Sequence, residues 1–124
     1  MNIIVVGGGK LGSTITEYLS AEGHDVVVID TNANVVEELV NTFDVIGVVG
    51  NGASYPVLTE AGADKAYLIM TATPSDELNI LCCMLAKRMG TRHAIARVRD
   101  PEYSHQLDFM RSEFGLSMMV NPDY

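Results

Sequence analysis

The chain has 124 residues, 48% of them hydrophobic, and a formal net charge of −8 at pH 7. This length suits one domain with a sizeable core but is short for an enzyme with its own substrate domain. The acidic balance argues against nucleic acid or anionic lipid as a direct partner. No apolar run reaches the roughly 18 residues that a membrane span needs. Because Met1 leads directly into a strand-like segment, we expect no signal peptide and a cytoplasmic location.

The first 30 residues predict one βαβ unit. An apolar run over residues 2–6 is typical of a buried parallel strand, and a helical pattern then continues to about residue 22. Residues 25–30 form a second strand that ends in an acid. The turn between the first strand and the helix carries glycines at the spacing G-x-G-x-x-G: Gly7, Gly9 and Gly12.

Each of these three glycines has a separate expected role. Gly7 permits the tight turn after the strand, Gly9 allows a pyrophosphate to approach the backbone, and Gly12 allows the helix to lie close to the sheet. A diphosphate would then accept hydrogen bonds from the free amides at the helix N-terminus. The alternative is a tight turn without a ligand. The strand before, the helix after and the acid at the end of the second strand favour a nucleotide site.

Asp30 stands 18 positions after Gly12 and can accept hydrogen bonds from both hydroxyls of an adenosine ribose. Residues 31–34 contain no Arg or Lys, so nothing obvious would hold a 2′-phosphate, and the carboxylate would repel one. The expected ligand is an unphosphorylated adenosine diphosphate moiety, as in NAD, NADH, ATP or ADP.

A second glycine-rich turn follows the third expected strand. A helix over residues 32–42 precedes the strand at 44–49, which leads into Gly50-Asn51-Gly52-Ala53-Ser54. In a doubly wound sheet, the carboxyl ends of the first three strands share one edge, so this turn should face the same ligand. Asn51 could donate to the adenine or the ribose; the alternative is a left-handed asparagine that only forms the turn.

The second half of the chain predicts three more strands. A short helix ends near Ala61, a fully buried strand spans 66–71, and Thr73 and Pro74 follow in a loop that could cover the pyrophosphate or the ribose beyond it. An ordinary loop is the alternative. The strand at 93–99 places Arg97 near the ligand edge, where its guanidinium would bind a phosphate or form a surface ion pair.

After Arg97 a helix begins at Pro101 and stops at Gly115, and a sixth strand spans 116–120. Residues 121–124 end the chain as though another helix should begin. The predicted fold is therefore α/β: a three-layer, Rossmann-like, doubly wound parallel sheet of about six strands in a single domain over 1–124.

The helix expected over 76–89 is apolar almost all round until Lys87 and Arg88. Such a helix is buried on more than one side, so we expect one side on its own sheet and the other on a second subunit. Its neighbouring cysteines, Cys82 and Cys83, are expected to be buried free thiols. No residues stand at metal-ligand spacing, and nothing resembles a catalytic triad, a nucleophile elbow or a carboxylate pair.

The chain resembles a known family along essentially its whole length. The motifs that carry the resemblance include Gly7-Gly8-Gly9-Lys10-Leu11-Gly12, Val28-Ile29-Asp30, Gly50-Asn51-Gly52-Ala53-Ser54, Asp76-Glu77-Leu78-Asn79 and Ala96-Arg97-Val98-Arg99-Asp100-Pro101. Together they are similar to the N-terminal RCK domain, also called the KTN domain, of TrkA-type potassium transport proteins. The glycine motif is shared with many dehydrogenases, whereas the last two motifs in combination are much more specific.

The resemblance implies a non-enzymatic cytosolic regulatory subunit that assembles from dimers into rings beneath a membrane potassium channel or transporter. Nucleotide binding, of NAD(H) or ATP/ADP, would change the ring's shape and so bias gating. Carried over by position, residues 7–11 would wrap the diphosphate and Asp30 would hold the ribose. Asn51 and Gly52 would lie by the adenine, Thr73 and Pro74 by the distal half, and Arg97 would reach a phosphate.

These arguments define one set of candidate cofactor-binding residues: Gly7, Gly8, Gly9, Lys10, Leu11, Gly12, Asp30, Thr31, Asn51, Gly52, Thr73, Pro74 and Arg97. Family members usually continue through a crossover helix into a second RCK domain, whereas this chain stops at Tyr124. We therefore expect either a truncated chain or a partner domain on a separate chain. The alternative function is the cofactor-binding domain of an NAD-dependent oxidoreductase that lacks its substrate domain.

Overall fold

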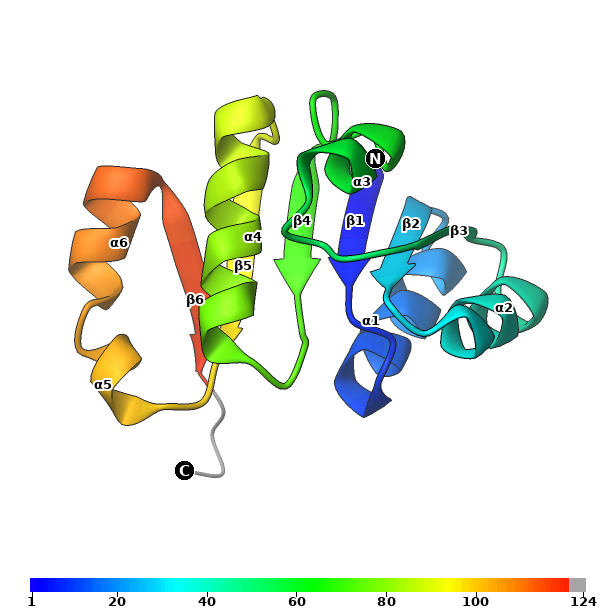
Figure 1. The fold of residues 1–124 in the computed structure, drawn as a ribbon, viewed down its shortest axis with the longest axis horizontal. Helices are drawn as coiled ribbons and strands as arrows, with labels where there is room; N and C mark the ends of the chain where they lie inside the picture. The colour runs from blue at the N-terminus through cyan, green and yellow to red at the C-terminus, as the bar shows by residue number, and fades with distance from the viewer. Residues whose placement is uncertain (121–124) are drawn as a thin grey trace.

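Six mostly apolar runs form one sheet in which every strand is parallel to its neighbours (Figure 1). The computed structural model describes residues 1–120. The strands are β1 (Asn2–Val6), β2 (Asp25–Asp30), β3 (Ile46–Val49), β4 (Leu68–Thr71), β5 (His93–Val98) and β6 (Leu116–Val120). Their order across the sheet is β3-β2-β1-β4-β5-β6, which confirms the doubly wound arrangement that the sequence predicts.

Helices cover both faces of the sheet, so the molecule has the expected three layers. The helices are α1 (Lys10–Ala21), α2 (Ala33–Thr42), α3 (Tyr55–Glu60), α4 (Asp76–Met89), α5 (Pro101–Ser104) and α6 (Leu107–Phe114). In Figure 1, α4 lies in front of β5, and α1 begins beyond the end of β1 and runs behind β2. All the glycine-rich turns follow the carboxyl ends of strands, which lie along one edge of the sheet.

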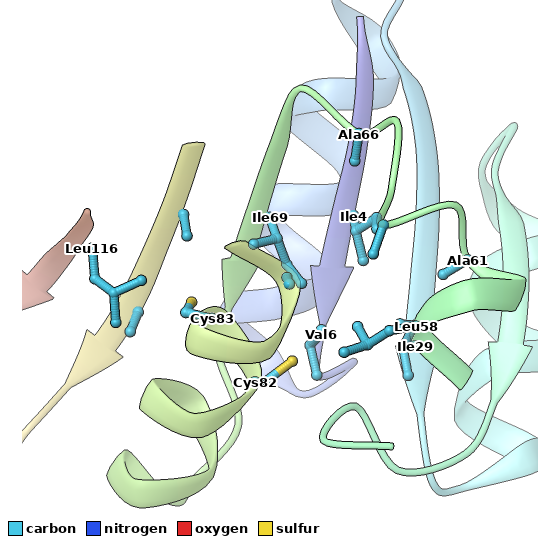
Figure 2. Close-up of a cluster of buried hydrophobic side chains, with 14 of the residues drawn as sticks. Ile4, Val6, Ile29, Leu58, Ala61, Ala66, Ile69, Cys82, Cys83 and Leu116 are labelled. Carbon is cyan, nitrogen blue, oxygen red and sulfur yellow. The ribbon is translucent and has the colours of Figure 1, made fainter. Parts of the chain in front are cut away.

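The core is divided by the sheet because successive residues of β1 point to opposite faces. Ile3 and Val5 pack with Leu39 of α2 and with Ile15 of α1. Ile4 and Val6 face the other way, in the cluster that Figure 2 shows, and this cluster includes side chains from α3, α4 and β6: Leu58, Cys82, Cys83 and Leu116. The central strand is buried on both faces, as a parallel sheet requires.

Capping side chains fix where several helices begin. Asn32 accepts hydrogen bonds from the amides of Asn34 and Val35 at the start of α2, and Ser75 accepts from Leu78 at the start of α4. Asp100 does the same for α5, where Pro101 occupies the first turn. These caps place α4 directly after the loop that contains Thr73.

The structure departs from the sequence prediction in three elements. The third strand begins at Ile46 rather than at residue 44. The predicted helix after Pro101 divides into α5 and α6, because the amide of Gln106 donates to the carbonyl of Tyr103 three residues back, which tightens the turn. Strand β4 is only partly buried, since Leu68 and Met70 are half-exposed on the face where α1 covers β1 and β2. Residues 121–124, where another helix was expected to begin, lie outside the described residues.

Candidate functional site

A cavity of about 390 Å³ lies at the carboxyl ends of the strands. It runs from the turn after β3, past β2 and β1, to the loop after β4 and the end of β5. Its walls include most of the predicted site residues: Gly7, Gly9, Lys10, Leu11, Asp30, Thr31, Asn51, Gly52, Thr73, Pro74 and Arg97. A larger cavity of about 560 Å³ lies at the opposite edge, near the amino ends of β1 to β3, and contains none of them.

The glycine-rich turn after β1 has the geometry that its spacing predicts. Gly7 has a φ of 103°, which L side chains rarely adopt, and its amide donates to the carbonyl of Ile29 at 2.8 Å. A Cβ on Gly12 would lie 1.7 Å from the carbonyl oxygen of Gly7, so only glycine allows α1 to pass this close to the turn. Gly12 is buried behind the cavity and does not line it.

Gly9 occupies the other side of this turn, where there is open space. A Cβ added there would meet nothing within 4 Å, and the residue is exposed at the cavity. Gly9 is also the N-cap of α1 and has no side chain that could accept from the first-turn amides. The helix therefore begins with uncapped N–H groups beside the cavity, the arrangement that binds anions at helix N-termini.

Asp30 is held at the cavity by two backbone amides. Its Oδ2 accepts from the amide of Gly8 at 2.7 Å, and its Oδ1 accepts from the amide of Asn32 at 2.8 Å. A carboxylate oxygen has two acceptor sites, so each can accept one further hydrogen bond from a ligand. Gly8 does not line the cavity; its contribution is to orient Asp30. From its place in the motif, Gly8 is predicted to lie in the phosphate-binding turn itself.

The second glycine-rich turn packs tightly against β1. Asn51 Oδ1 accepts from the amide of Ala53 at 2.8 Å, so the side-chain oxygen stabilises its own turn and only the NH₂ group remains for a ligand. Asn51 does not have a positive φ, so the left-handed conformation considered as the alternative is not adopted. A Cβ on Gly52 would lie 2.6 Å from Val6, and its carbonyl accepts from the Cys82 thiol at 2.8 Å.

The far wall of the cavity comes from the loop after β4 and from β5. Thr73 is held by Asn79 of α4, whose Oδ1 accepts from the Thr73 amide at 3.0 Å and from its hydroxyl at 2.7 Å. Arg97 is half-buried and lines the same wall. Asn79 is absent from the predicted set, and so are six lining residues: Val6, Ile29, Gly50, Ala72, Ser75 and Leu78. The signals available for Asn79 were its place in the motif Asp76-Glu77-Leu78-Asn79 and its amide beside the apolar run that follows.

The two cysteines are buried free thiols, as expected. Burial raises the pKa of the Cys83 thiol to about 12 and raises that of Cys82 further. Both thiols are therefore neutral at physiological pH and do not act as nucleophiles. Within residues 1–120, no group of three or more His, Cys, Asp or Glu side chains is placed to bind a metal ion.

A family model for the TrkA-N domain matches residues 3–122. The chain belongs to the TrkA-N domain family. Curated relatives include the Trk system potassium uptake protein TrkA of Vibrio alginolyticus, 40% identical over 105 residues, and the TrkA homolog of Archaeoglobus fulgidus, 32% identical over 122 residues. The matches cover 83% and 98% of this chain but only 23% and 28% of those proteins. This TrkA-N domain thus spans about a quarter of their length.

Solved structures share the fold of this TrkA-N domain. The TrkA-N domain of the inner membrane protein ybaL from Escherichia coli has a TM-score of 0.82 and 25% identity, with 97% of this chain and 85% of that chain covered. The GsuK channel bound to NAD has a TM-score of 0.76 and 22% identity, with 98% and 21% covered. Within the described residues, none of the helices of this domain is both long and apolar enough to cross a membrane.

Proposed function

We propose that this domain is a nucleotide-binding regulatory module of a potassium transport system, and that it binds an adenosine nucleotide at the carboxyl edge of its sheet. The observation that carries the proposal is the arrangement of Asp30 and the glycine-rich turn. A fixed carboxylate with free acceptor sites lies beside the uncapped N-terminus of α1, next to the open space at Gly9. Ribose hydroxyls and a diphosphate match these two features.

The proposed ligand is NAD or NADH, with ATP or ADP as the alternative. Asp30 disfavours a 2′-phosphate, and residues 31–34 offer no cation to hold one. The cavity continues past the glycine-rich turn to Thr73 and Arg97, which gives space for ligand groups beyond the first phosphate. Related folds were solved with NAD, in the GsuK channel, and with AMP, in the Shewanella denitrificans Kef CTD. Those likenesses concern the fold, so the choice of ligand rests on the residues of this chain.

In the proposed role, the domain acts from the cytoplasmic side of a membrane potassium channel or transporter as part of a homo-oligomeric ring. A ligand biases gating only if it has different affinities for two conformations of the ring. The exposed side of α4 supports a subunit contact, because Leu81 is 47% exposed there and Tyr55 of the neighbouring α3 is 67% exposed. Large apolar side chains on a helix already packed on its own sheet favour a partner surface.

The alternative is the cofactor-binding domain of an NAD-dependent oxidoreductase. The glycine-rich turn and Asp30 fit both functions equally well. The regulatory proposal is supported by family membership, and we propose that the domain has no enzymatic activity of its own. Hydride transfer would need a substrate site beside the nicotinamide, supplied by another domain.

Calorimetric titration with NAD, NADH, ATP, ADP and NADP tests the proposal, followed by a hydride-transfer assay with each dinucleotide that binds. We expect adenosine nucleotides to bind without turnover and NADP to bind much more weakly. Tight NADP binding would contradict the role given to Asp30, and redox turnover would favour the oxidoreductase.

A further inference from the structure

The side chain of Asn79 joins two backbone segments at the point where β4 and β5 separate. These strands pair as far as Thr71 and Ala96, and the chain after β4 then leaves the sheet. Asn79 is fully buried, and its amide spans this gap: Nδ2 donates to the carbonyl of Thr73 at 3.0 Å and to the carbonyl of Arg97 at 3.0 Å. With the two bonds accepted by Oδ1, every donor and acceptor site of the amide is used.

The same face of α4 holds other backbone segments around the cavity. Asp76, one turn earlier, accepts from the amides of Arg99 at 3.0 Å and Asp100 at 2.8 Å. Cys82, one turn later, donates to the carbonyl of Gly52. Polar side chains of α4 thus bind the backbone of the turn after β3 and the backbone near the end of β5. Among these side chains, Asn79 contacts both segments of the far wall, at Thr73 and at Arg97.

We infer that Asn79 is a positioning residue that sets the separation of Thr73 and Arg97, and hence the part of the site beyond the first phosphate. The inference rests on the proposed nucleotide site. Hydrogen bonds have preferred lengths and directions, so the four bonds of Asn79 fix two backbone segments relative to α4. An apolar side chain of similar size could fill the same space but would leave those polar groups without this partner. The amide therefore sets the geometry of two residues that line the cavity.

This role predicts that Asn79 matters for some nucleotides and not for others. AMP would contact Asp30, the glycine-rich turn after β1 and the turn at Asn51 and Gly52, and none of these belongs to the far wall. NAD extends further along the edge, past β1 to the wall formed by Thr73 and Arg97. Displacing that wall should therefore weaken NAD and leave AMP unaffected.

The test compares calorimetric affinities of the chain for NAD and AMP in two variants. Asn79→Asp keeps an accepting oxygen for Thr73 but removes both donors, toward the carbonyls of Thr73 and Arg97. Asn79→Leu keeps the size but removes all four bonds. Thr91→Val is the matched control, because the Thr91 hydroxyl is buried and donates to the carbonyl of Ala63 at 2.6 Å, far from the cavity. We expect the NAD dissociation constant to rise about tenfold or more in both Asn79 variants while that for AMP changes less than about twofold, since two or more hydrogen bonds are lost at the wall.

Equal weakening of NAD and AMP, or unchanged affinity for both, would overturn the inference, as would the same NAD-specific loss in Thr91→Val. If the wild-type chain binds neither nucleotide, the proposed function fails, and this inference fails with it. If the wild type binds both and the variants keep its ratio of affinities, only the inference fails.

A measurement on the wild type avoids dependence on variants that fold poorly. The amide of Thr73 donates to Asn79, so its hydrogen exchange reports how firmly the wall is held. NAD should slow this exchange more than AMP does when both ligands are saturating. Equal slowing by the two ligands, or no slowing by NAD, would contradict the role given to Asn79.

Discussion

Asp30 and Gly8, which are 22 residues apart in the sequence, are joined by a 2.7 Å hydrogen bond from the Gly8 amide to Oδ2 of Asp30. The bond connects the end of β2 to the glycine-rich turn after β1. It fixes the carboxylate beside the N-terminus of α1 before any ligand arrives, so the entropy of ordering this side chain is already lost in folding. The two halves of the proposed site, for ribose and for diphosphate, therefore have one fixed spacing.

Replacing Asp30 with Ala should weaken the binding of NAD or ADP by about 1–3 kcal/mol, because charge-assisted hydrogen bonds to the ribose are lost. Calorimetric titration measures the effect. Asp25→Ala is the matched control, since Asp25 is an exposed carboxylate at the opposite end of the same strand. Unchanged affinity in Asp30→Ala would remove Asp30 from the site.

Two glycines of the same turn should respond oppositely to alanine. Gly12→Ala should lower the free energy of unfolding by about 1–3 kcal/mol or more, because its Cβ would overlap the carbonyl of Gly7. Gly9→Ala should cost no more than about 1 kcal/mol of stability, yet weaken nucleotide binding about tenfold or more, because its methyl group would fill the space proposed for the diphosphate. Urea unfolding and titration of both variants separate the effects. Normal NAD affinity in Gly9→Ala would contradict the proposed ligand position.

The buried cysteines should be unreactive in the folded protein. With the pKa of Cys83 raised to about 12 and that of Cys82 higher still, a disulfide reagent at pH 8 should modify neither until denaturant is added. Above about pH 9 the thiols of the unfolded chain ionise, whereas those of the folded protein stay protonated. The free energy of unfolding should therefore fall as the pH rises above this value. Rapid labelling of the native protein would show that α4 opens readily. Cys82→Ala and Cys83→Ala, prepared separately, would identify the thiol that reacts.

A charge at Leu81 should disturb assembly without disturbing folding. Leu81 is exposed, so Leu81→Glu should change the free energy of unfolding by no more than about 0.5 kcal/mol. Light scattering at matched concentration should show a smaller oligomer than the wild type forms. Leu85, one turn later in α4, packs against the core, so a charge there would reduce stability as well. An unaltered oligomer in Leu81→Glu would exclude this surface from the interface.

Much of the site could be predicted because its signals are local. Strand, glycine-rich turn, helix, strand and terminal acid follow one another within 30 residues, and each has a physical requirement that few residue types meet. The positive φ at Gly7 and the close approach at Gly12 are consequences of that short pattern. The same holds for the caps at Asn32 and Ser75.

Gly8 and Gly12 belong to the candidate set but do not line the cavity, for a geometric reason. Both belong to the motif, but alternate positions of a tight turn point to different sides. Gly8 points toward α2, where a Cβ would lie 2.5 Å from Val35, and Gly12 points toward the backbone of Gly7. Spacing along the chain does not distinguish the side that faces the cavity from the side that faces the protein.

Periodicity and turn chemistry act over a few neighbouring residues, so the type and order of the strands, the glycine-rich turn and the acid at the end of β2 can all be predicted from the sequence. The tertiary structure alone decided which side chains hold the far wall of the site. Asn79 reaches Arg97, 18 residues later, only because β4 and β5 are neighbours in the sheet and diverge at that point. Hydrogen bonds act over about 3 Å, so a bond between distant residues depends on the strand order that brings them together.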